Sequence, residues 1–251
     1  MGSVAANDEQ YSILRIPESS PHLPKLIAKF RDTKLSALYT SPSEWIYQHS
    51  AECNHPLSVW ESRLANKNNV FVCVATKDPT LPVDDLLVHG GWVAFAAVRG
   101  PLTYDEFYPD PDMQQPIPAD PDVETRWHAY DLYTFPQHRG RGIARKLVAA
   151  ILATCTAVST TSDIQGAGAK SPKRIERARI RLFVNAKNVP LVEMYERMGL
   201  EPAGSVSLKE GLIANGMGES VPEKEVMGAE EWEKRFETRI GTAMVKVVDL
   251  G

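Results

Sequence analysis

Residues 126–152 read RWHAYDLYTFPQHRGRGIARKLVAAIL, and this stretch decides the fold. Aromatic and β-branched residues from Trp127 to Phe135 predict a strand. Pro136 ends that strand because proline cannot donate to a sheet ladder. A helix follows, since apolar residues recur at helical spacing. These residues are Ile143, Leu147, Val148, Ile151, Leu152 and Cys155.

Gly140 and Gly142 lie where the strand turns into the helix. Glycine lets a backbone approach a ligand closely, and the start of a helix offers unpaired N–H groups at the positive end of its dipole. Arg139 and Arg141 add charge at the same place. The turn therefore predicts an anion site suited to a phosphate or a pyrophosphate.

The spacing of the glycines separates this turn from two other phosphate-binding motifs. A dinucleotide-binding fingerprint would need glycine or alanine at Arg145, and a Walker loop would need Gly-Lys followed by Ser or Thr. The pattern Gln-x-x-Gly-x-Gly at Gln137, Gly140 and Gly142 instead resembles motif A of the GNAT superfamily of N-acetyltransferases. In that family the motif's amides hold the pyrophosphate of acetyl-CoA.

A second motif strengthens the resemblance. The family often carries Val-x-x-x-Asn-x-x-Ala-x-x-Leu-Tyr-x-x-x-Gly-Phe after its fifth strand, and Val184, Asn188, Tyr195 and Gly199 match at this spacing. The likeness covers about Val70 to Gly204 and the last strand. Other apolar residues replace three positions of the pattern, namely Leu191, Met194 and Leu200.

The resemblance implies a mixed α/β fold in a single domain over residues 1–251. Its central sheet would be mostly antiparallel, with one splayed parallel pair, and helices would cover both faces. Three segments lie outside the family pattern and are expected as insertions, at about 101–124, 159–174 and 209–241.

The resemblance also implies the residues that contact acetyl-CoA. The pantetheine would lie against exposed backbone of the strand before the turn, and the pyrophosphate would lie on the turn itself. Asn188 would add a contact and would also cap its helix. The predicted cofactor-binding residues are Leu132, Tyr133, Thr134, Phe135, Gln137, His138, Arg139, Gly140, Arg141, Gly142, Ile143, Ala144 and Asn188.

Tyr195 occupies the family's general-acid position, from which a phenol can protonate the leaving thiolate. The alternative is that its ring belongs to the core, on one helix face with Leu191 and Met198. The general base stays open between His128, Asp131 and a chain of water molecules. His128 and Asp131 lie on opposite faces of the predicted strand by parity, so at most one of them can point into the cleft.

Composition excludes several other classes of protein. The net charge of −4 gives no electrostatic case for nucleic acid as the main partner. The three cysteines are scattered and odd in number, so we expect neither a disulfide framework nor a structural metal site. No apolar run approaches the roughly 20 residues that span a bilayer, and the first residues do not resemble a signal peptide. We expect a cytoplasmic monomer or homodimer without a membrane partner.

The periodicity further predicts helices over 22–30, 45–50 and 57–64, and a proline-bearing connection over 78–88. Residues 101–124 carry six prolines and seven acids without a lysine or arginine. This segment is either a stiff negative flap over the acceptor mouth or a solvated surface loop.

The resulting hypothesis is direct acetyl transfer from acetyl-CoA to a primary amine of a small molecule. Two alternatives stay open. One is an acetyltransferase for protein lysines or N-termini. The other is a GNAT-fold protein that binds acyl-CoA without catalysis.

Overall fold

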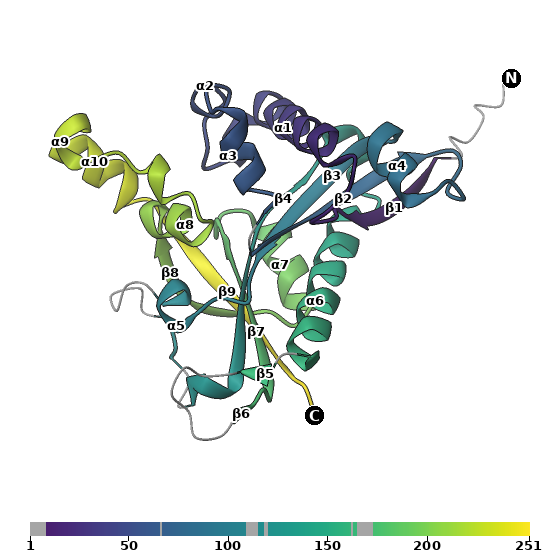
Figure 1. The fold of residues 1–251 in the computed structure, drawn as a ribbon. Coiled ribbons are helices and arrows are strands. Elements are labelled where there is room, and N and C mark those ends of the chain that lie inside the picture. Colours follow the sequence, from purple (N-terminus) through teal and green to yellow (C-terminus); the bar gives the residue numbers. More distant parts are fainter. Residues whose placement is uncertain (1–8, 66, 109–114, 118–119, 162, 165–172) are drawn as a thin grey trace, which may run out of the picture. The chain divides into compact units, whose positions relative to one another are not determined.

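A computed structural model of the chain describes residues 9–65, 67–108, 115–117, 120–161, 163–164 and 173–251 (Figure 1). The chain divides into two compact units. The first unit comprises Met1–Ala97 and Asp131–Ala150, and the second comprises Val98–Tyr130 and Ile151–Gly251.

The first unit builds its sheet in the order β1-β2-β3, with β1 antiparallel to β2. β2 and β3 are buried along almost their whole length, as their continuous apolar sequences predict. The strands are β1 (Gln10–Arg15), β2 (Asn68–Thr76) and β3 (Gly91–Arg99), and the helices are α1 (Leu23–Thr40), η1 (Pro42–Glu44), α2 (His49–Glu52), α3 (Leu57–Ser62) and α4 (Val83–His89).

Helix α1 is ten residues longer at its C-terminal end than the periodicity predicts. Its buried face continues through Lys34, Ala37 and Leu38. Because Lys34 is a charged residue at a buried position, it interrupts the apolar periodicity of the sequence. The helix predicted over residues 45–50 was wrong in its bounds, because α2 begins only at His49. Trp45 is extended, and Trp45 and Tyr47 are both buried, which is a period of two.

The connection predicted over residues 78–88 contains α4, so this expectation was also wrong. Pro82 precedes the helix, and Asp84 and Asp85 occupy its first turn, where negative charge favours a helix start. At the other end Lys29 donates hydrogen bonds to the carbonyls of Leu87, Val88 and Gly90, at 2.9, 3.0 and 2.6 Å. A distant lysine thus completes a short helix.

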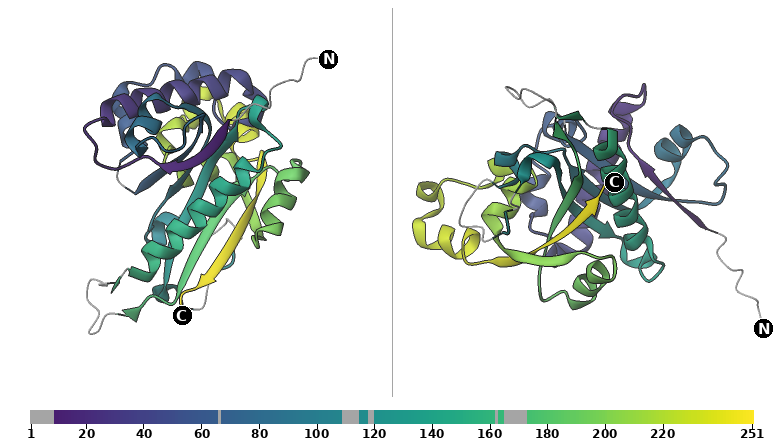
Figure 2. Two further views of the ribbon diagram at one scale, coloured as in Figure 1. Left: turned by 90° about the vertical axis from the view of Figure 1, so that its right-hand side faces the viewer. Right: turned by 90° about the horizontal axis from the view of Figure 1, so that it is seen from below.

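The second unit orders its strands β4-β7-β9-β8. β4 (Glu124–Thr134) runs parallel to β7 (Arg177–Val184), whereas β9 (Ile240–Asp249) is antiparallel to β7 and to β8 (Glu201–Ser207). β7 and β9 lie side by side in Figure 2. The mixed α/β fold with one parallel strand pair is therefore confirmed.

The two faces of the β4–β7 pair differ in chemistry. On one face Trp127 donates a hydrogen bond from its indole to Ser159 of α6 (Ile143–Thr161), at 3.1 Å. On the other face polar residues of β4 oppose arginines of β7. The register pairs Glu124 with Arg177, Arg126 with Arg179 and His128 with Arg181.

Helix α6 follows the predicted stripe, and Ile143, Leu147, Ile151 and Cys155 are buried. By length and composition alone this helix could cross a membrane. This was not predicted from the sequence, because no apolar run of that length was found. Arg145 and its neighbouring lysine stand in its first turn, and its apolar stripe is buried in the protein. Both features describe a core helix.

The three expected insertions contain more regular structure than their sequences suggest. Residues 101–124 hold α5 and η3, while residues 109–114 and 118–119 lie outside the described part. The second insertion begins later than expected because α6 continues to Thr161, and residues 162 and 165–172 are also outside. The remaining elements are α5 (Tyr104–Phe107), η3 (Pro121–Val123), η4 (Pro136–His138), β5 (Asp163–Ile164), β6 (Lys173–Arg174), α7 (Val189–Arg197), α8 (Leu208–Ala214), η5 (Gly218–Ser220), α9 (Lys224–Met227) and α10 (Ala229–Phe236).

Candidate active site

The turn between β4 and α6 is open above its two glycines, and residues 140–145 of this turn are called the cradle. Gly140 and Gly142 have φ angles of 75° and 73°, in the left-handed region that favours glycine. A Cβ atom added at either glycine would meet no atom within 4 Å. The glycines therefore serve the conformation of the turn and leave the space above it open.

The amides of this turn are free to bind a ligand. Within the described part of the chain, the N–H groups of residues 140–145 have no hydrogen-bond acceptor. The first bond of the helix runs from the amide of Lys146 to the carbonyl of Gly142, at 3.1 Å. Successive unpaired amides at a helix start form a binding site for an anion.

The arginines of the turn are anchored to the protein. The guanidinium of Arg139 donates two hydrogen bonds to Glu44, at 2.9 and 2.8 Å, and a third to the carbonyl of Thr134. These bonds to Glu44 raise the pKa of Arg139. Arg141 donates to the hydroxyl of Tyr11 at 2.6 Å, and the same hydroxyl lies 3.1 Å from Nδ1 of His138. The arginines thus hold the shape of the turn.

The end of β4 that leads into the turn contains an irregularity. Asp131 has a φ of 57°, which is rare for a residue other than glycine. Its carboxylate accepts a hydrogen bond from Nζ of Lys34 at 2.5 Å, and both side chains are buried. Because the strand does not alternate regularly through Asp131, the parity argument about His128 and Asp131 does not hold.

The backbone and side chains after Asp131 are partly engaged. The hydroxyl of Tyr133 lies 3.0 Å from that of Ser41, and the amide of Phe135 donates to the carbonyl of Val93 at 3.0 Å. Leu132 is half-buried, and the buried Oγ1 of Thr134 has no hydrogen-bond partner among the described residues. The amide of Phe135 is therefore not free to bind pantetheine.

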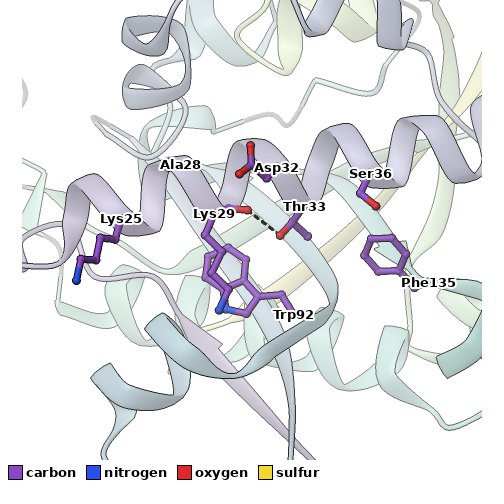
Figure 3. Close-up of a pocket in the computed structure, with 8 residues that line it drawn as sticks. All are labelled: Lys25, Ala28, Lys29, Asp32, Thr33, Ser36, Trp92 and Phe135. Atoms are coloured by element: carbon purple, nitrogen blue, oxygen red, sulfur yellow. Dashed lines mark hydrogen bonds between the residues drawn. The ribbon is translucent and has the colours of Figure 1, made fainter.

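A pocket of about 530 Å³ lies beside α1 in the first unit (Figure 3). Burial lowers the pKa of Lys29, one of its lining residues, to about 8. All three protons of this ammonium group are donated to carbonyls at the end of α4. Lys29 is thus a structural cap. The pocket is lined by Lys25, Ala28, Lys29, Asp32, Thr33, Ser36, Trp92 and Phe135.

Tyr195 lies in α7 of the second unit and is 4% exposed. Burial raises the pKa of its phenol, so the group keeps its proton at neutral pH. Asn188 stands at the N-cap position as predicted, but its side chain makes no capping hydrogen bond. Proline in the first turn and Gly199, with a φ of 79°, delimit the helix as predicted.

His128 is fully buried in the second unit. Its Nε2 lies 2.9 Å from Oδ1 of Asn215, and its Nδ1 accepts a hydrogen bond from Nε of Arg181 at 3.5 Å. Burial, and next the charge of Arg181, hold the pKa of His128 well below its ordinary value. The imidazole is therefore neutral, but both of its nitrogens have protein partners.

Residues 40–162 match the family model described as the Acetyltransferase (GNAT) family. This part of the chain is a GNAT acetyltransferase domain. It contains the cradle at residues 140–145 and Asp131, and the domain is an acetyl-CoA-dependent acyltransferase.

Solved structures similar to the whole chain include several acetyltransferases. Arabidopsis thaliana NAA60 in complex with a bisubstrate analogue shares 11% identity, with 96% of this chain and 100% of that chain covered and a TM-score of 0.48. A putative acetyltransferase from Acinetobacter baylyi shares 11% identity, with coverages of 96% and 94% and a TM-score of 0.49. Salmonella typhimurium yncA with acetyl-CoA shares 10%, with coverages of 96% and 95% and a TM-score of 0.45. No curated protein matches the sequence.

The predicted site residues of the acetyltransferase fall into both units. Asp131 and the predicted cofactor residues from Leu132 to Ala144 belong to the first unit, whereas His128, Asn188 and Tyr195 belong to the second. Sequence reasoning missed Lys34, the ion-pair partner of Asp131, and it missed Arg181. The signal for Arg181 is visible in the sequence, because arginine recurs at every second residue from 177 to 181.

Proposed function

We propose that the chain transfers an acetyl group from acetyl-CoA directly to the primary amine of a small molecule. The observation that supports acetyl-CoA as the donor is the row of free amides at residues 140–145, above which the glycines leave open space. A pyrophosphate carries the negative charge that such amides bind. The same free amides count against a GNAT-fold protein that no longer binds acyl-CoA.

The bound acetyl-CoA supplies the thioester, and residues of the chain manage the protons. Tyr195 holds its phenolic proton at neutral pH because it is buried, and we assign to it the protonation of the leaving thiolate. Both nitrogens of His128 are engaged by Asn215 and Arg181, and Asp131 is paired with Lys34. We therefore assign removal of the amine's proton to a chain of water molecules.

We place this reaction in the cytoplasm. The structure has free thiols at Cys53, Cys73 and Cys155, and a reducing compartment preserves such groups. Cys155 does not serve as an acyl-carrying nucleophile in this scheme. It is fully buried, and burial raises the pKa of its thiol.

The test is to replace Gly142 with tryptophan and measure acetyl-CoA binding by calorimetry. We expect binding to be lost, because the side chain would stand over the cradle. Gly228→Trp is the matched control, since Gly228 has a φ of 88° and equally open surroundings. Both changes strain the backbone, because a residue with a side chain is disfavoured at positive φ. Equal acetyl-CoA affinity in the two variants would refute the assignment of the cradle.

Transfer is measured by mass spectrometry with a panel of small amines and of lysine-bearing peptides. Acetylated small amines, with Gly142→Trp inactive and Gly228→Trp active, are the expected result. Acetylated peptides alone would favour the protein-directed alternative.

A further inference from the structure

One buried cation in the described part of the chain differs from the others. The structure buries four basic side chains there, and three of them lie within 4.0 Å of a carboxylate. Arg181, which is 0% exposed, makes no ion pair with any described residue. The three paired cations are Lys34 with Asp131, Arg63 with Glu52, and Arg126 with Glu124.

The guanidinium of Arg181 is held firmly but incompletely. Its Nη1 donates to the carbonyl of Phe107 at 2.6 Å and to Oε1 of Gln115 at 2.8 Å. The rings of Phe107 and Phe183 lie 3.9 and 4.8 Å from its central carbon. Its Nη2 is buried and, among the described residues, has no hydrogen-bond partner. A guanidinium fixed on one side thus presents a free donor on another.

Two further polar groups close to Arg181 also lack partners within the described ranges. They are Nε2 of Gln115, whose Oε1 already accepts from Arg181, and the hydroxyl of Tyr108, which follows Phe107. Buried donors without acceptors are costly, so a cluster of them indicates a ligand that supplies acceptors.

The charge around Arg181 has the sign that attracts an anion. Burial lowers its pKa to about 9, so it stays protonated at neutral pH. His128 beside it is neutral, and Arg99 contributes a second positive charge nearby. Glu210 is the nearby carboxylate, and it accepts a hydrogen bond from the amide of Ser207 in the cap of α8.

We propose that Arg181 binds the carboxylate of the acceptor, so that the acceptor is an amino acid or another small amine that carries a carboxylate. This inference rests on the proposed function. Arg181 opposes His128 in the ladder, one step before the last pair, Ala129 with Leu182. The free Nη2 can donate a hydrogen bond to an oxygen of a carboxylate, and such charged hydrogen bonds are strong.

The proposal also predicts an unusual effect on stability. A buried cation without a carboxylate partner costs folding free energy, and removing it relieves that cost. Arg181→Met should therefore unfold at the same temperature as the wild type or at a higher one. Arg179→Met is the matched control in the same strand. Arg179 pairs with Glu124 at 2.9 Å, so its loss should lower the melting temperature.

The direct test compares the L-amino acids with their α-amides as acceptors, at constant ionic strength. For the preferred acceptor, we expect wild-type kcat/KM to favour the acid over the amide by about 10- to 100-fold. Arg181→Met should abolish this preference, and Arg179→Met should keep it. Thermal shift with the same acids, in the absence of acetyl-CoA, gives a readout that does not depend on transfer. Inorganic phosphate is included to detect a general anion site.

Three outcomes would overturn the proposal. They are equal rates with acid and amide, a thermal shift with phosphate equal to that with the acid, and destabilisation of Arg181→Met as large as that of Arg179→Met. The first and third would make Arg181 structural, and the second would make it a general anion site. In each case acetyl-CoA binding at the cradle remains intact. Loss of the proposed function is a separate result, seen as wild-type protein that does not bind acetyl-CoA.

Discussion

Tyr195 is the residue whose role depends most on a single atom. Tyr195→Phe keeps the buried ring and removes only the hydroxyl. If this phenol protonates the thiolate, kcat should fall by about 10²–10⁴ while the affinity for acetyl-CoA stays nearly unchanged. The measurement is steady-state kinetics under conditions where chemistry limits the rate, together with calorimetry.

Tyr39→Phe serves as the control, since Tyr39 is 78% exposed and lies far from Tyr195 in sequence. An unchanged kcat in Tyr195→Phe would assign the ring to the core and leave the proton transfer to water.

Individual residues could be predicted from the sequence where the backbone imposes a requirement. The left-handed conformation at Gly140, Gly142 and Gly199 is an example, because few other residues adopt it. The partners of polar residues could not be predicted. Lys34 and Asp131 stand 97 positions apart, and nothing local in either neighbourhood indicates the other.

At the scale of elements, the ion pair of Lys34 and Asp131 joins α1 to the end of β4 within the first unit. Burial lowers the pKa of Lys34, and the charge of Asp131 opposes that change. Asp131→Asn keeps a residue that tolerates positive φ but leaves Lys34 unpaired. We expect it to lose about 3–5 kcal/mol of stability, because an uncompensated buried charge is costly.

The double variant Lys34→Met, Asp131→Asn removes both charges and should recover most of this loss in chemical denaturation. Its activity then separates two roles of Asp131. Recovered stability with recovered activity makes the pair structural, as we propose. Recovered stability without activity would return Asp131 to the chemistry as the general base.

Elements were predictable from sequence where one periodicity covers a whole segment. The buried strands and α6 are of this kind. Prediction failed where tertiary contacts determine the bounds of an element. Lys34 lies on the buried face of α1, and Lys29 of α1 donates a hydrogen bond to a carbonyl at the end of α4. Trp45 stacks on Phe95 and packs at a tilt against Tyr133, both from other segments, and the chain at Trp45 is extended where a helix was expected.

At the scale of the whole molecule, His128 should make stability depend on pH. Its pKa is lowered in the folded protein, so below about pH 6.5 the unfolded chain takes up a proton that the folded chain refuses. Stability should therefore fall as the pH drops from about 6.5, with a slope of at most about 1.4 kcal/mol per pH unit from this group.

His128→Gln should flatten that part of the profile in thermal melts between about pH 7.5 and 5.5, one unit to either side of the histidine's ordinary pKa. His89→Gln, at an exposed position, is the control and should leave it unchanged. A wild-type slope that persists in His128→Gln would place the titrating group elsewhere.

The division of the chain has a consequence for engineering. The chain passes from one unit to the other three times, after Ala97, Tyr130 and Ala150. Each passage falls inside a strand or a helix, namely β3, β4 and α6, and none falls in a loop. No single cut can therefore release either unit whole, and a chimera that exchanges one unit with a homologue must be spliced at three junctions within regular structure.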